Sequence, residues 1–175
     1  LVGLAAAISR ALTSSRDREL WIKVVRWLAE PLPSAALPFA QDIAKFTKPS
    51  DEKVRELKAI ANEVAVSCTR IFNLRFADIR GSRYPFKPTA IASALHRLLK
   101  TPVAVLAKTS GGETVLILKS SDSLAYNIAL HLYRKGLAED VVGHQTLTIL
   151  LLREGVEKKV VEAMREYMIS GPAGI

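Results

Sequence analysis

The feature that most constrains this chain is a repeated change of hydrophobic period after residue 50. Runs in which apolar residues recur every three or four positions, as in helices, alternate with short runs that are apolar throughout or at every second position, as in strands. This order predicts an α/β fold, with a mixed sheet of about four to five strands and flanking helices. We expect helices at 51–69, 89–99, 123–135 and 154–168, and strands at 71–79, 103–107, 114–118 and 146–152.

Residues 1–50 have a different character. A helix is expected at 17–29, where an apolar face includes Trp21 and Trp27, and three prolines follow it. We therefore expect 1–50 to be an N-terminal helical segment with a Pro-rich linker, and 51–175 to be the α/β domain. An apolar helix face needs a partner, so the two tryptophans are candidate partner-binding residues. They could equally be core residues.

Composition excludes several classes of protein. The chain is 49% hydrophobic, which is enough to bury a core and argues against wholesale disorder. Cys68 is the only cysteine, so an internal disulfide and a cysteine-based zinc site are excluded. No apolar run approaches the roughly 20 residues that span a bilayer, and we expect no membrane segment and a cytoplasmic location. Asparagine and glutamine are scarce, a balance typical of thermophile proteins.

Positive charge is concentrated in one stretch. Residues 71–135 contain ten Lys and Arg against three Asp and Glu, a net charge of +7 within a chain of +8. Such a local excess favours polyanions, above all nucleic acid. A generally basic thermophile surface is the alternative explanation.

A basic loop supplies the first group of candidate binding residues. Cations alternate there with Tyr84 and Phe86, and aromatic rings can stack on bases while cations neutralise phosphates. Both rings could instead anchor the loop to the core. With a lysine at the end of the next strand, the candidates for nucleic-acid binding are Arg80, Ser82, Arg83, Tyr84, Lys87 and Lys108.

Two later motifs supply the second group. Lys119, Ser120 and Ser121 lie between a strand and a helix, where hydroxyls and helix-terminal amides can hold a phosphate. An ordinary serine cap is the alternative. Gly143 and His144 enter the last strand, where glycine permits close approach of a ligand and histidine can donate to a phosphate or stack on a base. A strand-edge histidine beside a turn glycine is the alternative.

Signatures of catalysis are missing from the sequence. It contains no phosphate-binding loop, no His-Glu-x-x-His and no Gly-x-Ser-x-Gly motif. The three histidines are far apart and have few acids near them, so no metal site and no cofactor are expected. We name no catalytic residue.

Three blocks in the same order resemble the C-terminal DHH-associated domain of the DHH phosphoesterase superfamily, and most of all that of RecJ-type exonucleases. The stretches 90–95 and 100–107 resemble its helix and following strand. Lys119-Ser120-Ser121 lies where the family has Arg-Ser, and Val142-Gly143-His144 where it has Gly-Gly-His. Lysine in place of arginine loses bidentate phosphate geometry, and the Asp-His-His motif of the superfamily occurs nowhere in the chain.

The resemblance implies a non-catalytic, archaeal RecJ-like protein that binds single-stranded DNA and associates with GINS and the replicative helicase. Three alternatives stay open. The chain could be a protein-interaction module with vestigial DNA binding, or the nucleic-acid-gripping C-terminal half of a DHH-type single-strand exonuclease. Alanyl-tRNA synthetases carry a related domain, so an RNA role is also possible.

Overall fold

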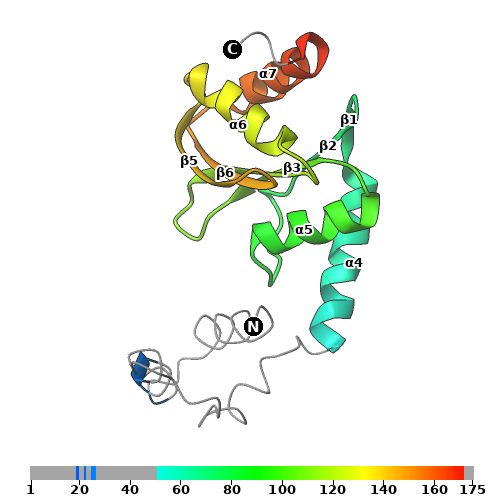
Figure 1. Ribbon diagram of the computed structural model, residues 1–175. Coiled ribbons are helices and arrows are strands. Elements are labelled where there is room, and N and C mark those ends of the chain that lie inside the picture. The colour runs from blue at the N-terminus through cyan, green and yellow to red at the C-terminus, as the bar shows by residue number, and fades with distance from the viewer. Residues whose placement is uncertain (1–18, 20–21, 23–24, 27–50, 172–175) are drawn as a thin grey trace. The chain divides into compact units, whose positions relative to one another are not determined.

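A six-stranded mixed sheet carries helices on both of its faces (Figure 1). The computed structural model describes residues 19, 22, 25–26 and 51–171. The chain divides into two units at Val54–Arg55, and the sheet belongs to the second. Trp21 and Trp27 lie outside the described residues, and the predicted boundary at residue 50 stays a prediction.

The elements confirm the predicted α/β class. Strands β2 and β3 are parallel and are joined through α5, whereas every other neighbouring pair is antiparallel. The strand order is β1-β2-β3-β4-β6-β5. The bounds are α4 Asp51–Ser67, β1 Thr69–Ile71, β2 Leu74–Asp78, α5 Pro88–Leu99, β3 Val103–Lys108, β4 Thr114–Lys119, α6 Leu124–Arg134, β5 Ala138–His144, β6 Leu147–Leu152 and α7 Glu157–Ser170.

Helices α4 and α5 cover one face of the sheet. Ile91 and Leu95 of α5 pack on Val105 and Ile117 of the central strands, and all four side chains are buried. Helix α5 begins with Pro88, whose missing N–H costs nothing in the first turn. It ends at Lys100, which has a left-handed backbone with φ 55°. We call this the α5 face.

Helices α6 and α7 cover the opposite face. Ile128 and Leu132 of α6 and Met164 of α7 are completely buried against Leu116 and Leu150. Helix α6 ends as its sequence predicts, because Gly136 takes φ 70° and its N–H bonds to the carbonyl of Tyr133 at 2.8 Å. None of the helices in the described residues is both long and apolar enough to cross a membrane.

The segment predicted as one strand at 71–79 contains the last residue of β1, a turn and all of β2. Ile71 pairs with Leu74, so Phe72 and Asn73 form a two-residue turn between β1 and β2. Ile71 and Leu74 share one face although they are three positions apart, so the alternation of the two strands changes phase across the turn. The exposed apolar residue Phe72 continues the period-two pattern with Leu74 and Phe76 and hides that change in the sequence. Phe72 carries the turn with φ 54°, although no glycine marks the position.

Strand β5 was not predicted. It lies at the edge of the sheet, beside β6 alone, and most of its residues are exposed. Glu139 and Asp140 break its apolar pattern, as acids on edge strands commonly do to prevent pairing with other chains. With this strand and the β1–β2 hairpin, the sheet has six strands instead of four or five.

Candidate nucleic-acid interface

The predicted binding residues lie at opposite ends of the central strands. Lys108 and Lys119 mark those ends, because Lys119 pairs with Val103 at the start of β3 and Lys108 closes the same strand. At about 3.3 Å per residue, the two ends are about 17 Å apart. We call Arg80, Ser82, Arg83, Tyr84, Lys87 and Lys108 the loop cluster, and Lys119, Ser120, Ser121, Gly143 and His144 the His144 cluster.

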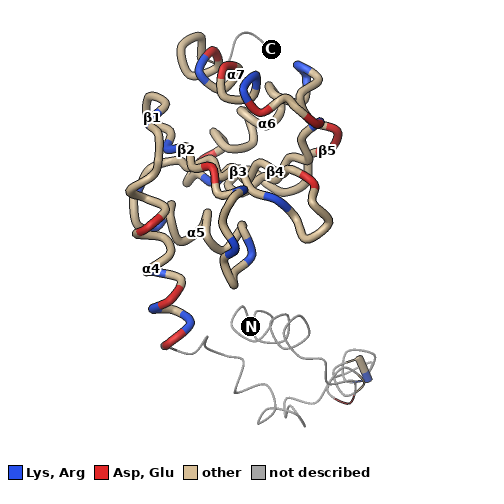
Figure 2. The backbone as a smooth tube through the Cα atoms, turned by 180° about the vertical axis from the view of Figure 1, so that it is seen from behind, with Lys and Arg blue, Asp and Glu red and all other residues tan. Residues whose placement is uncertain are grey.

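The loop cluster surrounds one cavity. All six of its residues line a space of about 480 Å³, together with apolar residues such as Ile91 and Ala107. Ser82, Arg83, Lys87 and Lys108 are exposed. The loop that leads into α5 carries basic positions and no acidic ones (Figure 2). The cavity can therefore attract an anion, and its binding role stays a prediction.

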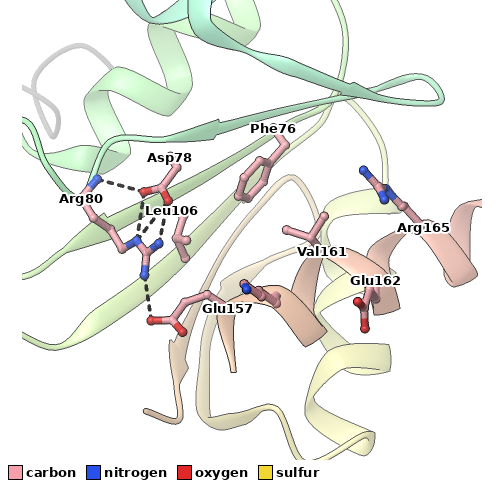
Figure 3. A pocket seen from close by; sticks show the side chains of 9 residues that line it. Phe76, Asp78, Arg80, Leu106, Glu157, Val161, Glu162 and Arg165 are labelled. Atoms are coloured by element: carbon pink, nitrogen blue, oxygen red, sulfur yellow. Dashed lines mark hydrogen bonds and ion pairs between the residues drawn. The ribbon is translucent and has the colours of Figure 1, made fainter. Parts of the chain in front are cut away.

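Arg80 uses its guanidinium inside the fold. It donates to Asp78 Oδ2 at 2.7 Å and to Glu157 Oε1 at 2.7 Å, which joins the end of β2 to the start of α7 (Figure 3). The hydrogen bond from Arg80 holds the pKa of the Asp78 carboxyl below its usual value, and Asp78 and, to a smaller extent, Glu157 raise the pKa of Arg80. A phosphate contact from Arg80 would compete with two carboxylates.

The aromatic residues of the loop are half-buried. Tyr84 and Phe86 both pack against the core of the α5 face, and the Tyr84 hydroxyl donates to Glu63 Oε1 at 3.0 Å. This hydrogen bond ties the loop to α4. The rings anchor the loop, as the alternative interpretation of the sequence holds, and stacking by Tyr84 stays a prediction.

In the His144 cluster, one hydroxyl joins the lysine to the histidine. Lys119 Nζ donates to Thr146 Oγ1 at 3.4 Å, and Thr146 Oγ1 lies 3.2 Å from His144 Nδ1. When Thr146 accepts from the lysine and donates to Nδ1, Nε2 of the exposed His144 is left for a ligand. Sequence reasoning missed Thr146, although its place two residues after the histidine in the β5–β6 turn was a usable signal.

The two serines of this cluster have different roles. Ser120 is 0% exposed; its hydroxyl donates to Asp122 O at 2.7 Å and accepts from Ala125 N–H at 3.0 Å. A ligand could reach it only by breaking these bonds. Ser121 is exposed, and its hydroxyl lies 3.1 Å from His96 Nε2.

His96 of helix α5 lies beside the His144 cluster. Its Nδ1 lies 2.7 Å from the carbonyl of Thr101, which fixes Nδ1 as the donor and leaves Nε2 to accept from Ser121. This chain of bonds joins the end of α5 to the segment after β4. Spacing alone could not show it, because the two residues are 25 positions apart.

Gly143 is required by packing within the sheet. Its φ is 136°, and a Cβ there would lie 2.3 Å from Leu147 O and 2.9 Å from Thr148 Cα. The absence of a side chain at Gly143 therefore allows strand β6 to approach closely. Contact between Gly143 and a ligand stays a prediction.

The exposed chemistry of the His144 cluster is suited to an anion. An ammonium and an imidazole are available from Lys119 and His144, and each can donate a hydrogen bond to a phosphate oxygen. The Ser121 hydroxyl can do so only by giving up its bond to His96 Nε2. Lys119 forms no salt bridge within the described part of the chain. Among the described residues, no group of three or more His, Cys, Asp or Glu side chains could hold a metal ion.

Solved structures share this arrangement of strands and helices. No model of a known protein family matches the sequence, and neither does any curated protein. Magnesium-bound RecJ from Thermus thermophilus matches with TM-score 0.55 and 14% identity over 98% of this chain and 26% of RecJ. The chain has a RecJ-like fold.

Two further structures extend the likeness. CDC45 from Entamoeba histolytica matches with TM-score 0.53 and 15% identity, over 94% of this chain and 36% of CDC45. The pGpG-specific phosphodiesterase PggH from Vibrio matches with TM-score 0.50 and 14% identity, over 87% of this chain and 51% of PggH. The RecJ-like chain thus spans from about a quarter to half the length of these proteins, and at such identities the likeness shows the fold alone.

Proposed function

We propose that this chain binds single-stranded nucleic acid, with DNA as the expected ligand, as a non-catalytic and scaffolding part of a RecJ-like protein of DNA replication or repair. The observation that carries the proposal is the His144 cluster, in which Lys119 and His144 present donors at one end of the sheet and the exposed Ser121 lies beside His96. Its fold is shared with RecJ and with CDC45.

Charge supports this choice of ligand. The +7 stretch supplies Lys119 and every cation of the loop cluster, and apart from Arg80 none of these cations is in a salt bridge with a described residue. Unpaired cations gain affinity from phosphates by releasing counterions, and this gain falls as salt rises. Single strands are favoured over duplexes because they can bend into a surface with donors about 17 Å apart.

Fluorescence anisotropy of labelled single- and double-stranded oligonucleotides over a salt series tests the proposal. We expect micromolar or tighter binding of the single strand that weakens steeply with salt. Lys119→Gln should lower affinity and reduce the salt slope by about 0.7, while Lys158→Gln on α7 serves as a charge-matched control. Absence of binding at low salt would refute the proposal and leave the +7 stretch as a general surface property.

The partner component of the proposal is association with GINS and the replicative helicase. It rests on the family resemblance and on the fold shared with CDC45, and Trp21 and Trp27 are the proposed contacts. Co-purification with a GINS protein that survives nuclease treatment is the expected result. Loss of the association on nuclease treatment would show that nucleic acid alone bridges the two proteins.

A second candidate function follows from the span of the match. Because the chain covers 26% of RecJ, it could be the nucleic-acid-gripping C-terminal part of a single-strand exonuclease. The natural full-length protein would then degrade single strands when supplied with Mg²⁺ or Mn²⁺. Binding by that protein without degradation would favour the non-catalytic function.

A further inference from the structure

One row of paired residues crosses the whole sheet at the end where the His144 cluster lies. The strand registers connect the row residue by residue, from the β1 edge to the β5 edge. In order, its members are Arg70, Arg75, Val103, Lys119, Leu147 and His144. Neighbouring strands are about 4.8 Å apart, so the row is about 24 Å long.

The side chains of this row share the α5 face. Val103 belongs to the core of that face and Leu147 packs against it, whereas Ile71 and Leu74 belong to the opposite core. Since side chains alternate along a strand, Arg70 and Arg75 point to the same face as Val103. Both arginines therefore extend the positive surface of Lys119 towards β1.

In the middle of the row, the turn that ends α5 supplies a positive charge that the row itself lacks. Val103 is 0% exposed, but Lys100, three residues before it, is exposed on the left-handed cap of the helix. The bonds from His96 to Thr101 and Ser121 hold this turn beside the His144 cluster. Positive charge thus continues from Lys119 through Lys100 to the β1–β2 hairpin.

The hairpin itself is built in a way that costs stability. Phe72 is 52% exposed and has φ 54°, a backbone region that bulky residues avoid. Arg70 and Arg75 are direct cross-strand partners, where like charges repel. Neither arginine forms a salt bridge with a described residue, and Arg70 Nε donates only to the carbonyl of Phe72 at 2.8 Å. A bound polyanion and a stacked base would offset these costs.

We infer that the row is a track for single-stranded nucleic acid, with Arg70 and Arg75 holding phosphates and Phe72 stacking on a base at the hairpin tip. The inference rests on the proposed function and adds to it a second contact region at the far edge of the sheet. Its chemistry is that of sequence-tolerant single-strand binding, in which a basic surface is combined with an aromatic platform.

Three variants test the track. Phe72→Asn removes the ring at a position where asparagine tolerates the positive φ, so folding should not suffer. The double variant Arg70→Gln/Arg75→Gln removes two charges, and Lys158→Gln/Lys159→Gln on α7 removes two charges as its matched control. Each variant is measured by anisotropy with a labelled dinucleotide and with an oligonucleotide of about 12 nucleotides, after circular dichroism has confirmed its fold.

We expect Phe72→Asn to weaken binding of the long oligonucleotide about tenfold at every salt concentration. The arginine double variant should weaken it and reduce the salt slope by about 1.4, which is two phosphates at about 0.7 each. Binding of the dinucleotide, which is too short to join both regions, should not change. The α7 control should leave both ligands unaffected.

Two results would overturn the inference. If the long oligonucleotide binds the wild type and the hairpin variants equally while Lys119→Gln weakens it, the track is absent but the proposed function stands. If the wild type binds neither oligonucleotide, the proposed function falls together with the track.

Discussion

Replacing Ser120 with alanine should destabilise the fold without weakening nucleic-acid binding. The substitution removes the acceptor of the buried Ala125 N–H, which now bonds at 3.0 Å, and the donor to Asp122 O at 2.7 Å. An unpaired buried amide costs about 1–3 kcal/mol. With a dependence of about 1–3 kcal/mol per molar urea, the unfolding midpoint should fall by about 1 M.

Ser121→Ala is the matched control, because its hydroxyl is exposed and bonds only to His96 Nε2 at 3.1 Å. We expect its stability to change by less than about 0.5 kcal/mol and its affinity for single strands to fall. Urea unfolding followed by circular dichroism and anisotropy on the same samples measures both effects. If Ser120→Ala kept wild-type stability and lost affinity, the assignment of Ser120 as a structural cap would be refuted.

Three further predictions concern stability. Gly143→Ala should cost about 1–3 kcal/mol in thermal unfolding, because the new Cβ meets Leu147 O; an unchanged melting temperature would contradict the observed approach. Arg80→Gln should cost less than about 1 kcal/mol at neutral pH, since the ion pair is partly exposed. Arg80 lowers the pKa of Asp78 in the folded protein. The difference in the free energy of unfolding between Arg80→Gln and the wild type should therefore shrink as pH falls through the acid range, and a constant difference would refute the ion pair. The pKa of His131 is lowered by burial and by Lys135, against an opposing effect of Glu166, so the neutral form is favoured in the fold. The stability that the neutral His131 contributes is complete above the ordinary histidine pKa and is lost as pH falls below it. The free energy of unfolding of His131→Gln should therefore depend less on pH than that of the wild type between about pH 7 and pH 5.

Much of the α/β domain could be predicted from its apolar periods. Strands β3, β4 and β6 and helices α5, α6 and α7 lie where those periods place them, because each buries a face whose pattern is visible in the sequence. Strand β5 escaped prediction because an exposed edge strand needs few apolar residues. The β1–β2 turn escaped because Phe72 takes a backbone conformation that glycine or asparagine usually occupies.

The sequence predicts which residue types form the candidate site, but it does not show which of these residues lie together in space. Spacing identified Lys119 and His144, but their connection through Thr146 depends on the pairing of β4 with β6. Spacing also could not show how the loop cluster lies relative to the His144 cluster, whereas strand direction puts them at opposite ends of β3. The row from Arg70 to His144 exists only in the register of all six strands.

The most direct test of nucleic-acid binding at this surface is a backbone amide NMR titration of the isotope-labelled protein with a short oligothymidylate. We expect the largest shift changes at Lys119–Ser121 and at His144–Thr146, with smaller ones at Arg70–Arg75. Amides of α7 that face away from the sheet should not move. Saturable changes confined to α7, or no changes at low salt, would contradict the account.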